Sequence, residues 1–316
     1  MTTVEQLETA AAVGLRTRTR RGRLRPSFRG TWWRHLVAWV AIAFALFPVA
    51  YITSAAFNVD QTLSGARLIP HEVTTENFKQ LLSGKVETKA GDDPIEVSYL
   101  RWYANTILIA AVVAIFTVIL GALAAYAFSR FRFRGRRMGL FALMLIQMFP
   151  QLLAVVAIYL IILHSGEVFG FIGLDTLTGL AIVYLGGVLG VNVWLMKGFF
   201  DTIPPELDES ARVDGATPSQ VFWGVILPLA APVLAVIGLF SFIGVVNEFV
   251  IASVLLQDKE QQTLAIGLWK FIDQQYAENW GPFAAGVLMA APPVVILFLF
   301  LQRFIVSGLT GGAVKG

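Results

Sequence analysis

The chain has 316 residues, of which 56% are hydrophobic and only 14% are charged, whereas soluble domains contain about 25% charged residues. Such an excess of apolar side chains is typical of a protein embedded in lipid and excludes an ordinary soluble domain. The net charge is +3, and the chain contains no cysteine and only three histidines, which excludes disulfides, thiolate chemistry and cysteine-based metal sites.

The first 35 residues form a basic amino-terminal arm that contains eight arginines. An arginine-rich arm can bind nucleic acid, but this one adjoins an apolar segment, and its arginines are not interleaved with aromatic residues. We therefore interpret residues 1–35 as a cytoplasmic arm that sets the membrane topology and contacts lipid headgroups, with no nucleic-acid partner.

Six apolar segments are long enough to cross the hydrocarbon core of a membrane, which takes about 20 helical residues. A backbone in lipid must satisfy its own hydrogen bonds, so each segment is predicted to be a helix. The predicted fold class is therefore an all-α polytopic membrane protein with six transmembrane helices. The six segments are 36–57, 103–128, 139–163, 177–196, 222–256 and 283–305.

The distribution of basic residues predicts the orientation of these spans. The segment 129–137 contains five arginines, and together with the arm, the loop at 197–221 and the carboxyl end it places 17 of the 24 basic residues on one side. Cytoplasmic loops are enriched in lysine and arginine. Both termini are therefore predicted to face the cytoplasm.

The order of the segments indicates one transport core. Residues 58–101 are predicted to form an extracytoplasmic loop that is long enough for a small cap. The five later spans follow at short spacing, so we expect a core at 102–306 and a cytoplasmic tail at 307–316. The sequence has no glycine-rich Gly-Lys-Ser/Thr phosphate loop. We therefore expect no cofactor on this chain, and ATP and Mg²⁺ on another polypeptide.

Three amides lie within the third and fourth predicted spans. Gln147 and Gln151 are four residues apart, on either side of Pro150, which predicts that they share one helix face near the middle of the membrane. An amide at that depth requires a polar partner. These two residues and Asn192 are therefore predicted either to form hydrogen bonds between helices or to line a polar passage.

Residues 201–221, between the fourth and fifth spans, contain consecutive helix signals. Pro204 and Pro205 suit the first turn of a helix, where a missing N–H costs nothing. The acidic residues that follow, Glu206, Asp208 and Glu209, favour the positive end of the helix dipole. This helix is predicted to end near residue 214, where a glycine follows that can adopt the left-handed conformation.

A second helix is predicted to begin at once, because Thr217, Pro218 and Gln220 fit a capping box. It is expected to continue into the fifth span, with kinks at Pro228 and Pro232. We call residues 204–219 the elbow. A short helix joined rigidly to a transmembrane helix can act as a lever on a soluble partner, and the alternative is a loop that lies on the membrane surface.

Asn247 and Glu248 lie near the end of the fifth predicted span. A continuous helix from Gly224 would place them about 36 Å further along its axis, which is the outer membrane interface. We therefore predict that they lie at the mouth of a passage rather than deep in the membrane.

The elbow resembles the coupling motif of ABC-importer permeases of the binding-protein-dependent type. The family pattern is Glu-Ala-Ala, two variable residues, Asp-Gly-Ala, and Ile-x-Leu-Pro about nine residues later. This chain departs from it only at Ser210 and Val225, which are small changes. The matching positions are Glu209, Ser210, Ala211, Asp214, Gly215 and Ala216, followed by Val225, Leu227 and Pro228.

Four further segments are similar to one branch of this family, the second permease subunits of maltose/maltodextrin importers. The likeness extends from about Trp33 to the end of the chain, and the longer arginine-rich arm is unmatched. The similar segments are 125–133, 147–150, 197–200 and the glycine-rich tail 308–316.

The resemblance implies a type I importer core in the bacterial inner membrane, built with a second permease subunit, two ATPase subunits and a soluble sugar-binding protein. It implies that the six elbow residues at 209–211 and 214–216 dock into a cleft on one ATPase. When ATP closes the ATPase pair, the permeases turn outward-facing. The loop at 257–280 matches the position of the family's segment that enters the binding protein. In maltose-type importers the sugar site belongs chiefly to the other permease, and the resemblance implies the same here. The cargo consistent with this likeness is maltose, a maltodextrin, trehalose or another glycoside.

Two other classes of protein were weighed against an importer subunit. A stand-alone secondary sugar carrier driven by an ion gradient would need inverted repeats or carboxylates at the membrane midplane. An intramembrane enzyme would need a nucleophile with its base, or a metal cluster, at depth. Neither pattern is evident in the sequence, so we expect a non-catalytic transport subunit.

Overall fold

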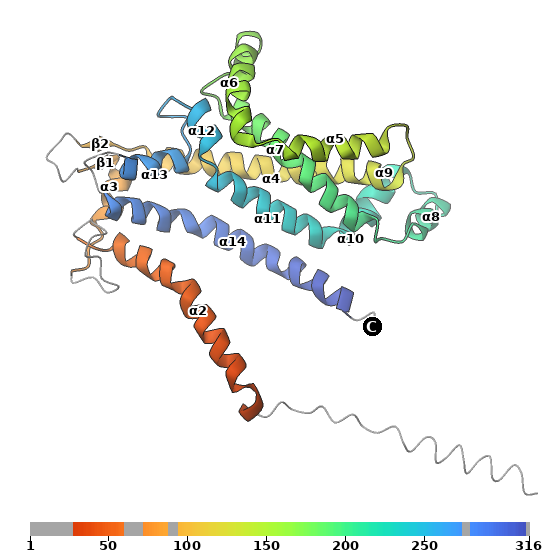
Figure 1. Cartoon of the computed structure of the whole chain (residues 1–316), viewed down its shortest axis with the longest axis horizontal. Helices are drawn as coiled ribbons and strands as arrows, with labels where there is room; N and C mark the ends of the chain where they lie inside the picture. Colours follow the sequence, from red (N-terminus) through yellow and green to blue (C-terminus); the bar gives the residue numbers. More distant parts are fainter. Residues whose placement is uncertain (1–27, 60–71, 88–93, 274–278, 314–316) are drawn as a thin grey trace, which may run out of the picture. The chain divides into compact units, whose positions relative to one another are not determined.

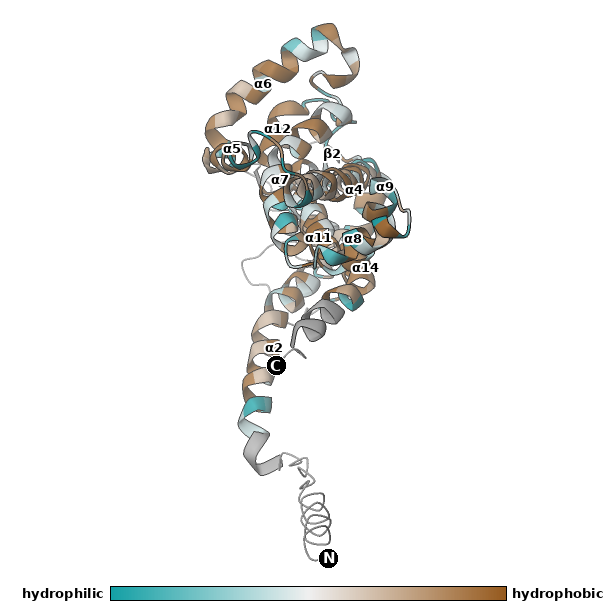
Figure 2. Ribbon diagram, turned by 90° about the vertical axis from the view of Figure 1, so that its right-hand side faces the viewer, coloured by the Kyte–Doolittle hydropathy of each residue, from teal (hydrophilic) through white to brown (hydrophobic). Residues whose placement is uncertain are grey.

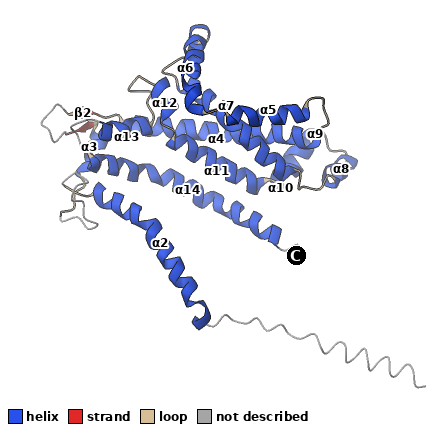
Figure 3. Ribbon diagram, in the orientation of Figure 1, coloured by secondary structure: helices blue, strands red, loops and turns tan. Residues whose placement is uncertain are grey.

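The computed structural model describes residues 28–59, 72–87, 94–273 and 279–313. Predictions for the arm up to residue 27, for parts of the loops at 58–101 and 257–280, and for the last three residues lie outside the described residues. The chain divides into two compact units, residues 1–50 and 51–316, which are described separately. Helices account for almost all of the described secondary structure (Figure 3), which confirms the all-α class.

Helix α2 (Phe28–Ala56) contains the described part of the first unit. It begins before the predicted start at residue 36, so the last residues of the basic arm are helical. Most large apolar side chains in the part of α2 that belongs to the first unit are exposed, and the exposed fraction of Phe44 is 83%. A helix with apolar residues exposed on several faces suits lipid or another transmembrane helix rather than water.

Four long helices form the centre of the second unit, namely α4 (Tyr99–Arg130), α7 (Leu177–Phe200), α11 (Ala231–Asn247) and α14 (Trp280–Ala313). Helix α4 packs against both α7 and α11, and α11 packs against α14 (Figure 1). Apolar residues predominate along these helices (Figure 2). Their buried contacts are made by small and branched side chains, which allow close helix packing in lipid.

The described residues contain four to six candidate spans, against the six that the sequence predicts. Helices α2, α4, α6 (Gln151–Val168) and α14 each contain a stretch that is long and apolar enough to cross a membrane. Two bent pairs, 177–187 with 189–200 and 218–229 with 231–247, raise the number of candidate spans to six. All six overlap the predicted apolar segments.

The third predicted span is not one continuous helix. Helix α5 (Arg136–Met148) ends before Phe149 and Pro150, both of which are extended, and α6 begins at Gln151. Figure 1 shows that the axis of α6 points in a different direction from the axis of α5. Proline restricts the residue before it to extended conformations and cannot donate a helical hydrogen bond. The prediction that Gln147 and Gln151 share a helix face is therefore wrong.

The fifth predicted span is also interrupted. It consists of α9 (Pro218–Val221), the π-helical turn η2 (Phe222–Ile226), α10 (Leu227–Leu229) and α11, and it bends by 77° between 229 and 231. Pro228 and Pro232 lie on either side of this bend, as predicted. The span ends at Asn247 rather than at 256, because a short helix α12 (Val250–Leu255) begins after a break.

A small cap lies at the amino-terminal end of α4. It contains α3 (Glu76–Ser83), the antiparallel strands β1 (Lys85–Val86) and β2 (Ile95–Glu96), and helix α13 (Leu264–Asp273). The short 3-10 helix η1 (Gly170–Ile172) lies apart, between α6 and α7. Leu81, Val86 and Phe271 are buried together with residues from α4 and α14. The described residues of the loop at 58–101 therefore share their core with the helix ends.

Candidate functional site

The elbow has the local structure that the sequence predicts. Helix α8 (Glu206–Val213) begins directly after Pro205 and ends at Asp214. Gly215 has a φ of +87°, the left-handed conformation that residues with a Cβ rarely adopt. The Ala216 amide donates to the Ala211 carbonyl oxygen at 3.0 Å, which closes the end of the helix.

The capping box that follows is also formed. The backbone N–H of Gln220 donates to the Thr217 hydroxyl oxygen at 3.3 Å, and the backbone N–H of Thr217 donates to the Gln220 side-chain oxygen at 2.8 Å. Pro218 occupies the first turn of α9, where its missing N–H is not needed. The backbone N–H groups of residues 215–217, which join α8 to α9, each donate a hydrogen bond within the elbow and so restrain the turn.

One face of the elbow is exposed and the other is packed. Glu209, Ser210, Asp214 and Gly215 are exposed, whereas Ala211 and Ala216 are half-buried. Both alanines pack against the core cluster formed by α4, α7 and η2. The motif therefore presents its polar and charged positions outward.

Val213 is a further residue of this face that sequence reasoning missed. Its side chain is 88% exposed at the end of α8. A branched apolar residue that lies beside exposed carboxylates gives the elbow an apolar contact point with a charged rim. The signal in the sequence was an apolar residue within a polar helix.

The packed face contains a buried ion pair that the sequence did not reveal. Arg130, the last residue of α4, places its Nε 2.6 Å from an oxygen of Asp208, and the two side chains are only 10% and 6% exposed. The same guanidinium donates to the Ile203 carbonyl oxygen at 2.8 Å. Asp208 had been interpreted only as a favourable charge in the first turn of α8. The pair fastens the elbow to α4.

A second polar cluster joins the end of α7 to the end of α4. The Ser129 hydroxyl donates to one oxygen of Asp201 at 2.7 Å, and the Lys197 ammonium lies 2.5 Å from the other oxygen. Burial raises the pKa of Asp201, but hydrogen bonds from Lys197 and Ser129 outweigh it and lower that pKa. The carboxylate therefore stays charged at neutral pH and holds these helix ends together.

The structure brings Gln147 and Asn192 together, with Ser241 of α11, at one cavity of about 210 Å³. Gln147 donates to the carbonyl oxygen of Gly187, next to the 47° bend of α7. Asn192 lies 3.4 Å from the Ser241 hydroxyl. Both amides therefore form hydrogen bonds to a neighbouring helix at the wall of this cavity. Ser241 was missed because a single hydroxyl in an apolar span gives little signal.

The other three passage candidates lie elsewhere. Gln151 is exposed at the start of α6. Asn247 is exposed and donates to the Ile243 carbonyl oxygen of its own helix at 2.9 Å. The estimate of 36 Å assumed a straight helix, and the bend before Ala231 makes it wrong. Helix α11 is only about 24 Å long.

Glu248 is held by three hydrogen bonds at the start of α12. Its carboxylate accepts from the amides of Ile251 and Ala252 at 2.7 and 3.1 Å. It also accepts from the Tyr184 hydroxyl of α7 at 2.5 Å. Such contacts are those of a carboxylate that caps a helix and ties it to a neighbouring helix.

Fold and site together define a polytopic membrane protein with a rigid, exposed elbow at one end of its helices. The protein-family model described as "Binding-protein-dependent transport system inner membrane component" matches residues 117–309. The chain belongs to this family of inner-membrane transport permeases.

Individual relatives agree with this assignment. The chain is 41% identical to the maltose/maltodextrin transport system permease protein MalG of Vibrio vulnificus, over 90% of this chain and 96% of that protein. It is 40% identical to the MalG protein of Escherichia coli K12, over 89% and 95% of the two chains. Among solved structures, it is similar to a chain of a bacterial ABC transporter involved in the import of the acidic polysaccharide alginate. The TM-score is 0.69 and the identity 26%, over 88% and 97% of the two chains.

Proposed function

We propose that this chain is the permease subunit of an ATP-driven, binding-protein-dependent importer of maltose- or maltodextrin-type oligosaccharides. The observation that supports it most is the 41% identity to a maltose/maltodextrin permease along 90% of the chain. The intact elbow supports the same function, because a transport subunit driven by a soluble motor needs a rigid surface on which that motor can act.

The partners follow from this function. We assign ATP, Mg²⁺ and the hydrolytic step to two ATPase subunits, and the delivery of sugar to an extracytoplasmic binding protein. A second permease subunit completes the passage. Glu209, Ser210, Ala211, Asp214, Gly215 and Ala216 form the ATPase-docking site of this chain, and the exposure of its polar positions supports that role.

The orientation is part of the same proposal. The elbow and the cap lie at opposite ends of α4, because Arg130 contacts α8 whereas Trp102 lies in the cap core. The positive-inside rule, applied to the 17 basic residues on one side, assigns the elbow and both termini to the cytoplasm. The cap then faces the binding protein.

Reconstitution in liposomes tests this function. Labelled maltose or maltodextrin should enter only when this chain is combined with the second permease, the ATPases, ATP and the binding protein. Uptake by the lone chain under an ion gradient would instead assign it to the secondary carriers.

We also propose that the five polar residues of the spans contribute to the sugar passage. Gln147 and Asn192 line the cavity of about 210 Å³ between α5, α7 and α11. Gln151 and Asn247 are exposed outside this cavity, and Glu248 holds the start of α12, so these three are proposed as lining of other parts of the passage. Planar amides and hydroxyls in a passage can exchange hydrogen bonds with sugar hydroxyl groups as the sugar moves.

Replacement of one passage amide tests this assignment. Asn192→Leu should lower sugar uptake by the full transporter about fivefold, the effect of losing one hydrogen bond of about 1 kcal/mol. Stimulation of ATP hydrolysis by the binding protein should remain, because the elbow is untouched. Leu195→Asn, at an exposed position of the same helix, provides a comparison. Equal uptake by wild type and Asn192→Leu would remove Asn192 from the passage.

A further inference from the structure

Helix α4 differs from the other spans in its continuity. It extends over 32 residues, about 48 Å, without a proline. Helices α2 and α14 contain internal prolines, and the α7 and α9–α11 spans are bent by 47° and 77°. An unbroken helix that packs against α7 and α11 transmits displacement along its axis better than a kinked one.

The elbow end of α4 is fastened by the buried pair of Arg130 and Asp208. Both charges are almost completely removed from solvent, and they lie 2.6 Å apart. Separating them would leave two unpaired charges in a poorly solvated site. A displacement of α8 is therefore passed to the last turn of α4.

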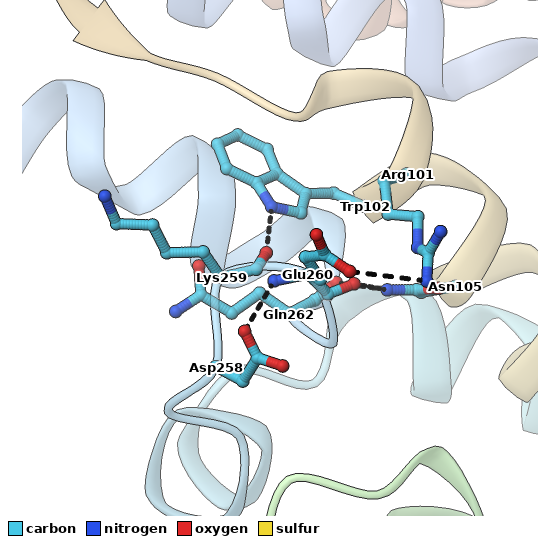
Figure 4. A network of polar contacts seen from close by, with 7 residues as sticks. All are labelled: Arg101, Trp102, Asn105, Asp258, Lys259, Glu260 and Gln262. Carbon is cyan, nitrogen blue, oxygen red and sulfur yellow. Dashed lines mark hydrogen bonds and ion pairs between the residues drawn. The ribbon is translucent and has the colours of Figure 1, made fainter.

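The opposite end of α4 is fastened to residues 259–264, which lead into the first residue of α13 and which we call the outer segment. Asn105 is 6% exposed, and its amide nitrogen donates to two carbonyl oxygens of this segment. The acceptors are Glu260 at 2.8 Å and Gln262 at 3.0 Å (Figure 4). One side chain thus satisfies two backbone groups that belong to a loop more than 150 residues away in the sequence.

Two neighbours on the same face of α4 add to this attachment. The Trp102 indole donates to the Lys259 carbonyl oxygen at 3.0 Å (Figure 4). The Thr106 hydroxyl oxygen accepts from the Leu264 amide at 2.7 Å. Residues 102, 105 and 106 follow the spacing of one helix face. Four successive contacts therefore hold the outer segment along its whole length.

Close packing reinforces the hydrogen bonds. A Cβ at Gly267 of α13 would lie only 2.0 Å from the Trp102 ring, so the indole is pressed against the α13 backbone. The Lys270 ammonium lies 5.2 Å from the centre of the same ring. Arg101 and Glu260 add a weak, exposed ion pair at 3.8 Å. Helix α13 and the outer segment are thus packed on the first turns of α4.

We propose that α4 is a strut that links the ATPase-docking elbow to the extracytoplasmic loop, with Asn105 as its outer positioning residue. The inference rests on the function proposed above and adds the route by which the two surfaces communicate. Asn105 lies at the end of α4 opposite to the elbow. It holds the outer segment so that a bound sugar-binding protein and the elbow move the same helix.

Asn105→Leu tests the proposal, because leucine has a similar volume and cannot donate to the two carbonyl oxygens. The full transporter is reconstituted, and ATP hydrolysis is measured with and without the sugar-loaded binding protein. We expect stimulation by the binding protein to fall at least tenfold per assembled complex, with basal hydrolysis unchanged. A purely structural role for Asn105 would reduce the yield of complex and leave the stimulation of each complex intact, which would overturn the proposal.

A covalent cross-link tests whether Asn105→Leu acts by releasing the outer segment from α4 or by disturbing the fold of the chain. The chain has no cysteine, so Arg101→Cys with Glu260→Cys introduces a unique pair of thiols across the weak ion pair. In the Asn105→Leu background, a short bis-maleimide linker should restore stimulation. Lys79→Ala, which removes an equally exposed ion pair of the cap, serves as the control and should behave as wild type.

The outcomes also separate the strut from the proposed function. If wild type shows stimulated hydrolysis and Asn105→Leu matches it, the strut is refuted while the importer function stands. If wild type itself shows no hydrolysis coupled to the binding protein, the function is refuted. Failure of the linker to restore stimulation in a correctly assembled variant would also count against the strut.

Discussion

Glu209→Lys is expected to abolish sugar uptake by the assembled transporter. Glu209 is exposed on the outward face of α8, which we propose to dock onto the ATPase. Reversing one charge at a complementary interface replaces an attraction with a repulsion and costs several kcal/mol. A loss of about 4 kcal/mol corresponds to a roughly thousandfold weaker association with the ATPase.

Two measurements check this result. The variant should insert in the membrane at wild-type levels, and the ATPase subunits should no longer co-purify with it. Glu167→Lys, at an exposed position near the end of α6, makes the same change of charge away from the elbow and should leave both properties intact. Normal uptake and co-purification of Glu209→Lys would refute the docking assignment.

Asp208→Asn is expected to be the most destabilising single substitution in the elbow. Asparagine has nearly the same shape but leaves the buried Arg130 guanidinium without a counter-charge. Breaking a buried pair in this way costs about 3–5 kcal/mol. The elbow should detach from α4, so that proteolysis at 204–217 is accelerated and the thermal midpoint of the purified chain falls.

The double variant Arg130→Met with Asp208→Leu tests whether the charge itself causes this effect. Apolar residues of similar size remove both buried charges, and such replacements are often neutral or stabilising. Recovery of the thermal midpoint in the double variant would therefore assign the loss in Asp208→Asn to the unpaired arginine. An unchanged midpoint in Asp208→Asn would mean that the pair contributes little to the elbow.

Local signals made the elbow predictable, and long-range contacts made other features unpredictable. The capping box at 217–220 and the left-handed Gly215 depend on neighbouring residues, so the sequence was sufficient for both. The Arg130–Asp208 pair joins positions 78 residues apart, and the contacts of Asn105 with the outer segment join positions about 156 apart. No short pattern encodes such pairings.

The interrupted spans illustrate a different limit. Apolar length alone suggested a continuous third helix, whereas Pro150 and its extended neighbour end α5 at Met148. Hydropathy indicates whether a segment prefers lipid, but it gives almost no information on helix breaks within that segment. The positions of Gln147 and Gln151 changed for this reason, while the overlap of the six spans with the apolar segments did not.

The 77° bend between α10 and α11 has a mechanical consequence. The residues from 218 to 229 form a short arm of about 18 Å that meets α11 nearly at right angles. A sideways shift of about 5 Å at residue 218, the end of this arm that adjoins the elbow, corresponds to a turn of about 16° about the α11 axis. The angle follows from the ratio of the ~5 Å shift to the ~18 Å arm length. Under the proposed function, a displacement of the elbow by the ATPase is therefore expected to turn α11 about its axis.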